Sequence, residues 1–497
     1  MQLARWLEGR RDAEPQTVAG HYASAVSLGT AEARPDAVRM LLRAASEARK
    51  VYAHGLALRQ AGLAQSLANG ERDRALAAEA VGDAYWMAEQ LDDALDAYGQ
   101  ALEHGHRAGL GEHDMARLSW KWVDLPTRWG GLHLRAAPTR EAIEAEISDG
   151  LRNALSADAS VLQARLLVAK ALVVWRFEHT DPPQEQALEV ANQALEIAER
   201  LERSGPLVIS AALDARATLL VALRRYDEAS EAFERRMSLI RSIAFREEQM
   251  DICAATARHR TALGDYAGAV AAADLADELV AGGDRRWVAY PARTRVEAYF
   301  YWDRWDDALR AHDSFLEVFR QDGPGRRLNV PGLVGGVAAA VHLLRGQNER
   351  ADTIERRIGR VPAQFDLIVA HALLGAGEPQ LALERVASVP FSRIWVLAIT
   401  AEAQAALERW DDLDETLATL DALSGTDQLP RAVAQIDRAR GLAGDELALA
   451  RAEAGFRRLG CVFEQARCLE LMGRVGEARA VYEQVGAEPA LGRCASR

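Results

Sequence analysis

The stretch ALAAEAVGDAYWMAEQLDDALDAYGQALEHGHRAG, residues 75–109, spaces small and large side chains as a pair of antiparallel helices requires. Counted from Ala75, small residues stand at positions 8, 20 and 27 and large ones at 11 and 24, namely Gly82, Ala94, Ala101, Tyr85 and Tyr98. Two helices of about 13 residues approach closely only where a small residue faces the partner helix, and large side chains fill the space beside it. One pair cannot bury its own apolar face, so this stretch predicts neighbouring pairs.

The turn between the two helices recurs along the chain. It reads RRYDEA, GDYAGA, DRWDDA, QNERA and GEPQLA, which end at Ala229, Ala269, Ala308, Ala351 and Ala382. Degenerate copies end at Ala57, Leu413 and Ala478. This spacing is typical of tetratricopeptide repeats, and about nine to twelve helix pairs account for most of the chain. The sequence therefore predicts an all-α, right-handed superhelical solenoid of antiparallel helix pairs.

The composition fits one long helical array. The chain has 497 residues, only 15 prolines and no linker rich in proline, glycine and serine that would divide it into separate domains. Residues that favour helices dominate, and no stretch shows the sustained alternation of a strand. The net charge of −13 argues against direct nucleic-acid binding, because phosphate contacts need a basic face.

The four cysteines indicate a reducing compartment. They are few and unevenly spaced, with no C-x-x-C pair, so we expect buried free thiols rather than disulfides or a metal site. The N-terminus lacks the apolar core of a signal peptide, and no uninterrupted apolar stretch approaches 18 residues. These features predict a cytoplasmic protein with no membrane partner.

No motif for catalysis or cofactor binding is present. The sequence lacks a phosphate-binding G-x-x-x-x-G-K-[ST] loop, a G-x-G-x-x-G turn, H-E-x-x-H and G-x-S-x-G. Paired aspartates stand at the turns between helices, where helix capping explains them without catalysis. We therefore predict no enzyme activity and no catalytic, cofactor or metal residues. An enzyme would require a buried polar cluster that the sequence does not reveal.

The repeat pattern is interrupted twice. The first break, SWKWVDLPTRWGG, places Trp120, Trp122 and Trp129 around a proline, where they either line a ligand site or pack an irregular loop against the solenoid. The second, QDGPGRRLNVPG, has the turn residues of a hinge or of a rigid loop between repeats. We expect an N-terminal cap with the first repeats, an irregular Trp-rich insertion, central repeats, a hinge, and C-terminal repeats with a cap, at residues 1–109, 110–160, 161–320, 321–332 and 333–497.

The first helix of each pair lines the concave side of such a solenoid, so its outward positions face a bound partner. Applied to this chain, that rule predicts a partner-binding groove formed by Asp83, Trp86, Arg258, Arg293, Glu297, Phe300, Tyr301 and His371. The segment AYFYWDRW carries more aromatic surface than one repeat's core needs. Phe300 and Tyr301 either anchor the partner, as aromatic residues often do, or pack against the next repeat.

Both ends of the chain resemble a larger family. The opening QTVAGHYASAVSLG resembles the segment that follows the nucleotide-binding and winged-helix parts of multidomain signal-transduction ATPase regulators, such as the maltose-regulon activator and cyclase-associated ATPases. Near the close, Phe456, Leu459 and Gly460, and then the phrase GAEPA at 486–490, are similar to the last repeats of those proteins. The resemblance implies a sensor arm that receives a ligand or a partner protein. Because the chain has no phosphate loop and no DNA-reading domain, ATP hydrolysis and DNA binding are not implied.

Two functions from different classes follow. The first is a non-catalytic scaffold that binds a protein segment in its concave groove, with Arg293, Glu297, Phe300 and Tyr301 as anchors. The second is the small-molecule sensor arm of a transcriptional regulator, with a closed site under residues 120–129. Whether the bound ligand is a peptide or a metabolite would distinguish the two functions.

Overall fold

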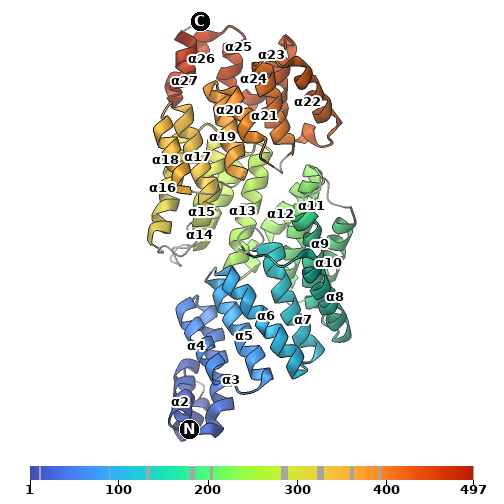
Figure 1. Ribbon diagram of the computed structural model, residues 1–497, viewed down its shortest axis with the longest axis vertical. Coiled ribbons are helices and arrows are strands. Elements are labelled where there is room, and N and C mark those ends of the chain that lie inside the picture. Colours follow the sequence, from blue (N-terminus) through green and yellow to red (C-terminus); the bar gives the residue numbers. More distant parts are fainter. Residues whose placement is uncertain are drawn as a thin grey trace. The chain divides into compact units, whose positions relative to one another are not determined.

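The computed structural model describes residues 1–10, 13–88, 90–129, 134, 136–178, 185–201, 205–280, 289–321, 330–358, 363–389 and 393–495. Over these residues the chain is helical and contains no strand, which confirms the predicted all-α helical-repeat solenoid. The chain divides into two compact units, Met1–Leu219 and Leu220–Arg497, which we describe one at a time (Figure 1).

Unit 1 is a succession of helix pairs. Its helices are α1 (Gln2–Glu8), α2 (Pro15–Ser27), α3 (Arg34–Lys50), α4 (His54–Leu67), α5 (Glu71–Met87), α6 (Leu91–Ala108), α7 (Glu112–Asp124), α8 (Arg140–Ser156), α9 (Ser160–Glu178), α10 (Glu185–Glu199) and most of α11 (Gly205–Ala222). Helix α11 is long and apolar enough to cross a bilayer, but 56% of that window is buried inside the protein. It also carries Asp214, which accepts a hydrogen bond from Arg128 at 3.0 Å, as in the core helix of a solenoid.

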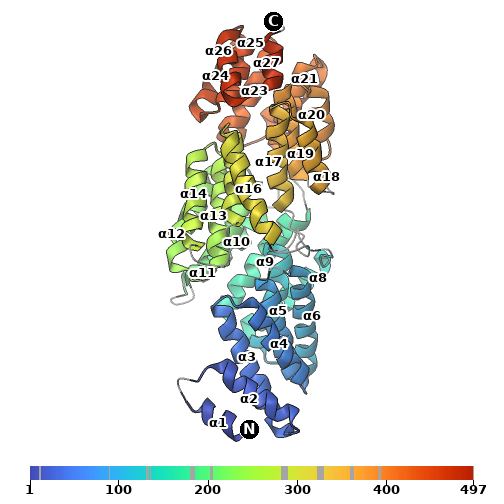
Figure 2. The same ribbon diagram turned by 90° about the vertical axis from the view of Figure 1, so that its left-hand side faces the viewer.

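Unit 2 continues the same pattern (Figure 2). Its helices are α12 (Tyr226–Ser238), α13 (Arg246–Ala262), α14 (Tyr266–Val280), α15 (Ala289–Tyr301), α16 (Trp305–Gln321), α17 (Val330–Leu344), α18 (Asn348–Ile358), α19 (Ala363–Ala376), α20 (Pro379–Val386), α21 (Arg393–Ala406), α22 (Trp410–Ala422), α23 (Pro430–Leu442), α24 (Glu446–Leu459), α25 (Val462–Leu471), α26 (Val475–Val485) and α27 (Glu488–Ala495). From α13 to α23, the first helix of each pair packs against the first helix of the next pair. We call this succession the inner helices of unit 2.

The pair α5–α6 has the packing that its sequence predicts. A Cβ atom on Gly82 would lie only 2.6 Å from ring carbons of Tyr98, so the tyrosine lies directly over the glycine. Ala94 and Ala101 are completely buried between the helices. The small residues therefore bring the two backbones together, and the aromatic ring fills the space that they leave.

The recurring turns are also built alike. The residue that ends each turn signature is buried in every copy, from Ala57 to Ala478. Two residues before the second helix, the backbone takes a left-handed conformation, at glycine in several turns but also at Tyr52, Arg224, Asp303 and Glu408. This conformation ends the first helix and reverses the chain direction. Side chains there carry strain that glycine would avoid.

The two breaks in the repeat pattern differ in outcome. Where the sequence predicts an irregular insertion at 110–160, α7 and α8 pack on each other as a further pair. The irregularity is a π-helical turn at Leu125–Trp129 with Pro126 inside it, because proline cannot donate the backbone hydrogen bond of a regular helix. Most of the predicted hinge at 321–332 lies outside the described residues.

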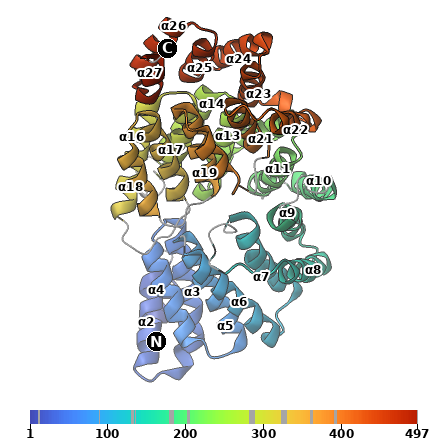
Figure 3. The ribbon, with the colours of Figure 1, turned by 45° about the horizontal axis from the view of Figure 1, so that its top comes forward.

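The end of unit 2 packs against its own middle. Apolar side chains of α25, α26 and α27 join those of α15, α16, α17 and α19 in one buried cluster. Figure 3 shows α27 next to α17, and Arg493 of α27 donates hydrogen bonds to the carbonyls of Gly375 and Ala376 at 3.2 and 3.0 Å. Each repeat adds a small rotation, so repeats far apart in the sequence meet once enough of them are stacked.

Candidate functional site

Six of the eight predicted groove residues lie on the inner helices of unit 2. Arg258 is on α13, Arg293, Glu297, Phe300 and Tyr301 are on α15, and His371 is on α19. The rings of Phe300 and Tyr301 lie 6.1 and 6.0 Å from the His371 ring. The other two residues, Asp83 and Trp86, belong to α5 of unit 1.

Asp83 is the centre of a buried charge cluster in unit 1. Its carboxylate pairs with Arg49 and with Lys121, the latter at 2.7 Å, and accepts a hydrogen bond from Tyr98 at 2.8 Å. Burial alone would raise the pKa of Asp83, but the two cations outweigh it and hold the pKa below its usual value. Lys121 also bridges to Glu79 at 2.7 Å. The charged side chains that α3, α5 and α7 bring together here therefore neutralise one another.

Trp86 packs within the Trp-rich segment rather than standing alone. Its ring makes an edge contact with Trp129, with centroids 5.6 Å apart. Trp129 donates its ring N–H to Asp124 at 2.9 Å and carries the guanidinium of Arg128 on its face. Trp120 stacks under Arg165 with 4.0 Å between the guanidinium carbon and the ring centroid. Trp120 and Trp129 therefore already contact other side chains of unit 1.

The aromatic residues of α15 have two different roles. Phe300 is buried in the cluster that joins α15 to α17, α25 and α27. Tyr301 is only partly buried, and its ring carries the guanidinium of Arg431, whose central carbon lies 3.9 Å from the ring centroid. The same guanidinium lies 4.8 Å from the ring centroid of Trp395. Neither Arg431 nor Trp395 was expected from the sequence.

Beside this aromatic pair lie charged groups that have no ion-pair or hydrogen-bond partner in the part of the chain that the structure describes. Arg258 is exposed and Glu297 is half-buried, and neither forms an ion pair or a side-chain hydrogen bond anywhere in the described chain. Burial raises the pKa of Glu297, although the guanidiniums of Arg258, Arg293 and Arg431 act in the opposite direction. The carboxyl of Glu297 therefore lies in a recessed position near three arginines without pairing to any of them.

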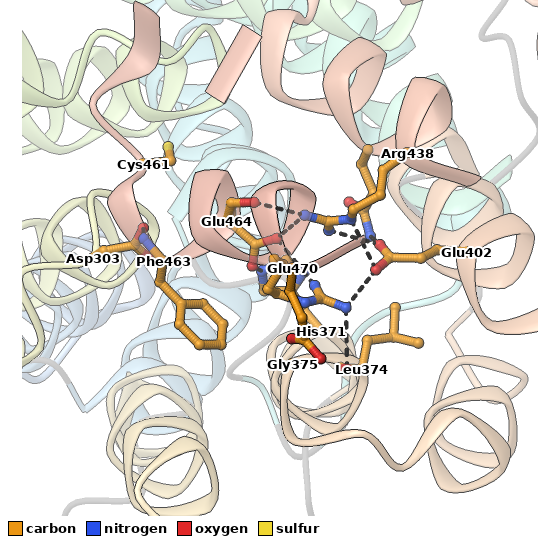
Figure 4. A network of polar contacts seen from close by, with 12 residues as sticks. Asp303, His371, Leu374, Gly375, Glu402, Arg438, Cys461, Phe463, Glu464 and Glu470 are labelled. Atoms are coloured by element: carbon orange, nitrogen blue, oxygen red, sulfur yellow. Dashed lines mark hydrogen bonds and ion pairs between the residues drawn. The ribbon is translucent and has the colours of Figure 1, made fainter. Parts of the chain in front are cut away.

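Next to these residues, a charged core joins α21, α23 and α25 (Figure 4). Glu402 accepts hydrogen bonds from Arg438 at 2.8 Å and from Arg467 at 2.6 Å. Glu464 contacts the same two guanidiniums at 2.5 and 3.0 Å. Two carboxylates and two guanidiniums thus form a closed, charge-balanced network, and the Arg438 and Glu402 side chains are each only 1% exposed.

The electrostatics of this core indicate a structural role. Burial alone would raise the pKa of Glu402 and of Glu464, but Arg438 and Arg467 outweigh it and lower both pKa values. Carboxylates whose pKa values are lowered in this way are poorly matched to a general acid, which needs a pKa near the working pH. The buried polar cluster that an enzyme would need is present, but its groups are already neutralised by one another.

His371 connects the charged core to the aromatic residues. Its Nε2 lies 3.1 Å from Glu464, and burial lowers its pKa, so the ring is neutral at pH 7 and donates this N–H to the carboxylate. The other ring nitrogen, Nδ1, is buried without a hydrogen-bond partner. His371 therefore packs its uncharged ring against Phe300 and Tyr301.

Asp303 fixes the start of α25 from a distance in the sequence. Its carboxylate accepts the backbone N–H of Phe463 at 2.8 Å, across 160 residues. The residue before α25, Cys461, makes no side-chain cap of its own and donates its S–H toward the carbonyl of Tyr301 at 3.2 Å. All four cysteines are buried and free, as the sequence predicts. These contacts hold α25 against α15 and so fix the surroundings of Tyr301.

The sequence rule selected Tyr301, Glu297 and Arg258, and it did not select Arg431, Trp395 or the residues of the charged core. Arg431 and Trp395 lie on α23 and α21. Within the core, Glu464 and Arg467 are three residues apart. Arg438 lies 26 residues before Glu464 and 36 residues after Glu402, so no local spacing links the whole network.

Comparison with known proteins identifies the fold. No protein-family model matches the chain, and no curated protein matches its sequence. Among solved structures, the Cut9–Hcn1 hetero-tetramer of APC/C is similar, with 14% identity, a TM-score of 0.50, and coverage of 96% of this chain and 87% of that chain. A Rap protein complexed with competence and sporulation factor has 14% identity and a TM-score of 0.44, and covers 72% of this chain and 99% of that chain. The similarity to Cut9–Hcn1 supports a tetratricopeptide-like helical repeat and, at this identity, shows the fold alone.

Proposed function

We propose that the chain is a non-catalytic interaction scaffold that binds a protein segment on the inner helices of unit 2. The observation that carries the proposal is the set of charged groups beside Tyr301, namely Arg258, Glu297 and Arg431, that form no ion pair or side-chain hydrogen bond among the described residues. Many other inward charges form ion pairs, as Asp83 and Glu402 do. The unpaired groups are thus left to make their bonds with a ligand.

The chemistry of these residues suits a protein ligand. Tyrosine, tryptophan and arginine are the residue types that most often dominate the energy of protein interfaces, because they bury large areas at little entropic cost. Recessed charges without partners are costly, and a bound polypeptide can supply both a carboxylate and backbone carbonyls to them. The groups come from α13, α15, α21 and α23, so the ligand extends across several repeats, as segments bound by solenoids do.

The alternative is the small-molecule sensor arm of a larger regulator, which the resemblance at both chain ends implies. That hypothesis placed a closed site under residues 120–129. The engagement of Trp120 and Trp129 with Arg165 and Trp86 favours packing there instead. We therefore rank binding of a protein segment first.

Site-specific crosslinking in the native host tests the proposal. A photoreactive residue replaces either Arg258 or Arg458, which is exposed on α24 and also has no partner. We expect mass spectrometry to find one protein crosslinked through position 258 and not through position 458. Crosslinking of the same proteins at both positions, or of none at position 258, would contradict the proposal. Co-purification of a metabolite with no crosslinked protein would support the sensor arm.

A further inference from the structure

Arg431 has an unusual environment for a buried arginine. It lies in the first turn of α23, and only 5% of its surface is exposed. The guanidinium contacts two aromatic rings, with its central carbon 3.9 Å from the Tyr301 centroid and 4.8 Å from the Trp395 centroid. Stacking of this kind satisfies the faces of the guanidinium, but its five N–H donors project from the edge and still need acceptors.

Those donors make no hydrogen bond to any residue that the structure describes. Among all described residues, no carboxylate lies within ion-pair distance of Arg431 and no oxygen accepts a hydrogen bond from it. The two other arginines buried this deeply behave differently, since Arg236 pairs with Glu248 at 2.9 Å and Arg438 with Glu402 at 2.8 Å. The nitrogens of Arg431 are also not sealed from solvent, because they are absent from the buried atoms that lack a partner. An acceptor from outside the chain can therefore reach them.

The surroundings add positive potential. Helix α23 begins with Pro430 and has no side-chain cap, so the positive end of its dipole lies beside Arg431. Arg258 and Arg293 act on the same region as Arg431, because all three lower the pKa of Glu297. The potential around the Arg431 guanidinium therefore favours an anionic group on a ligand.

We propose that Arg431 is the anchor for a carboxylate, supplied by an aspartate or glutamate side chain of the segment bound on the inner helices of unit 2. This inference rests on the proposed function and names the chemistry of its partner, an acidic peptide. The planar guanidinium, prealigned between Tyr301 and Trp395, donates two parallel N–H bonds to the carboxylate. The two rings shield part of the guanidinium from water, which strengthens the pair.

Peptide display tests both the scaffold function and the carboxylate anchor. The full chain is immobilised, and a library of short random peptides with free C-termini is panned against the wild type. Enriched peptides are resynthesised with each acidic residue changed to its amide and, separately, with an amidated C-terminus. Binding is measured by fluorescence anisotropy to the wild type and to Arg431→Gln, Arg431→Met and Arg458→Gln.

We expect enriched peptides to share one acidic position. Changing that residue to its amide should weaken binding to the wild type about tenfold or more, and should have no further effect on Arg431→Gln. Arg458→Gln should bind like the wild type, since Arg458 is exposed and without a partner. Arg431→Met keeps the packing between the rings and should lose affinity as Arg431→Gln does. Equal unfolding midpoints for the three variants would show that the folding is unchanged.

The outcomes separate the two proposals. Peptides that bind Arg431→Met as tightly as the wild type, or that share no acidic residue, would overturn the carboxylate anchor but leave the scaffold function supported. Loss of binding on C-terminal amidation alone would overturn the assignment to a side chain and identify the C-terminal carboxylate instead. Failure to enrich any peptide on the wild type would contradict the scaffold function and, with it, the anchor.

Discussion

Neutralising Glu464 should destabilise unit 2 by several kcal/mol. In Glu464→Gln, the guanidiniums of Arg438 and Arg467 lose the carboxylate that lies 2.5 and 3.0 Å from them. A charge pair at about 4 Å and an effective dielectric constant of about 20 contributes about 4 kcal/mol. Glutamine keeps part of the hydrogen bonding, and repulsion between Glu464 and Glu402 is relieved, so the two contacts do not simply add. Breaking a buried pair in this way costs about 3–5 kcal/mol, which we take as the expected loss.

The measurement is urea unfolding of the full chain at pH 7, followed by far-UV circular dichroism, with hydrogen exchange to localise the effect. With an m value of about 3 kcal/mol/M, the midpoint of unit 2 should fall by about 1 M or more. The protection of backbone amides should fall in α19, α21, α23 and α25 together, because the network ties these helices to one another. A matched control is Glu483→Gln, which removes an exposed pair with Arg479 and should cost less than about 0.5 kcal/mol.

A double variant isolates the electrostatic part. Arg438→Met with Glu464→Gln removes one charge of each sign and leaves the pair of Arg467 and Glu402 at 2.6 Å. We expect the double variant to lose at least about 2 kcal/mol less than the sum of the two single changes. The reasoning fails if Glu464→Gln costs less than about 1 kcal/mol, or if the two changes are additive.

Three further predictions concern helix packing, the turns and pH. Gly82→Ala should destabilise unit 1 by about 1–3 kcal/mol in thermal unfolding, because the new Cβ would lie 2.6 Å from the Tyr98 ring. In the control Gly62→Ala the new Cβ meets nothing within 4 Å, so this change should stabilise unit 1 by about 0.5–1 kcal/mol. Glu408→Gly should raise stability by about 0.5–1 kcal/mol by releasing a left-handed backbone, φ 58°, and an unchanged or lower melting temperature would refute this. Burial lowers the pKa of His259 from 6.5 to about 4, so below pH 6.5 the unfolded chain binds a proton that the folded chain does not. Stability should therefore fall by about 2 kcal/mol between pH 6.5 and 5, and His259→Gln should remove that part of the fall in urea titrations at the two pH values.

The local packing of each repeat could be predicted from the sequence. Gly82 under Tyr98, and the buried residue that ends each turn, are short-range features, because a helix pair places residues of known spacing against each other. The same rule located Tyr301, Glu297 and Arg258 on inner helices. It also left open whether Phe300 faces a partner or the core, because one helix position can do either until the next helix is placed.

The sequence by itself determined the all-α repeat, because this repeat depends on contacts within about 34 residues, the length of one helix pair. The tertiary structure alone decided that Asp303 holds the start of α25 and that Arg438 and Glu464 share a charged core. It also decided that Arg431 contacts Tyr301 and Trp395 and has no hydrogen-bond acceptor among the described residues. These contacts join helices separated by many repeats, and which ones meet depends on the rotation accumulated over the whole stack, a quantity that no single repeat records.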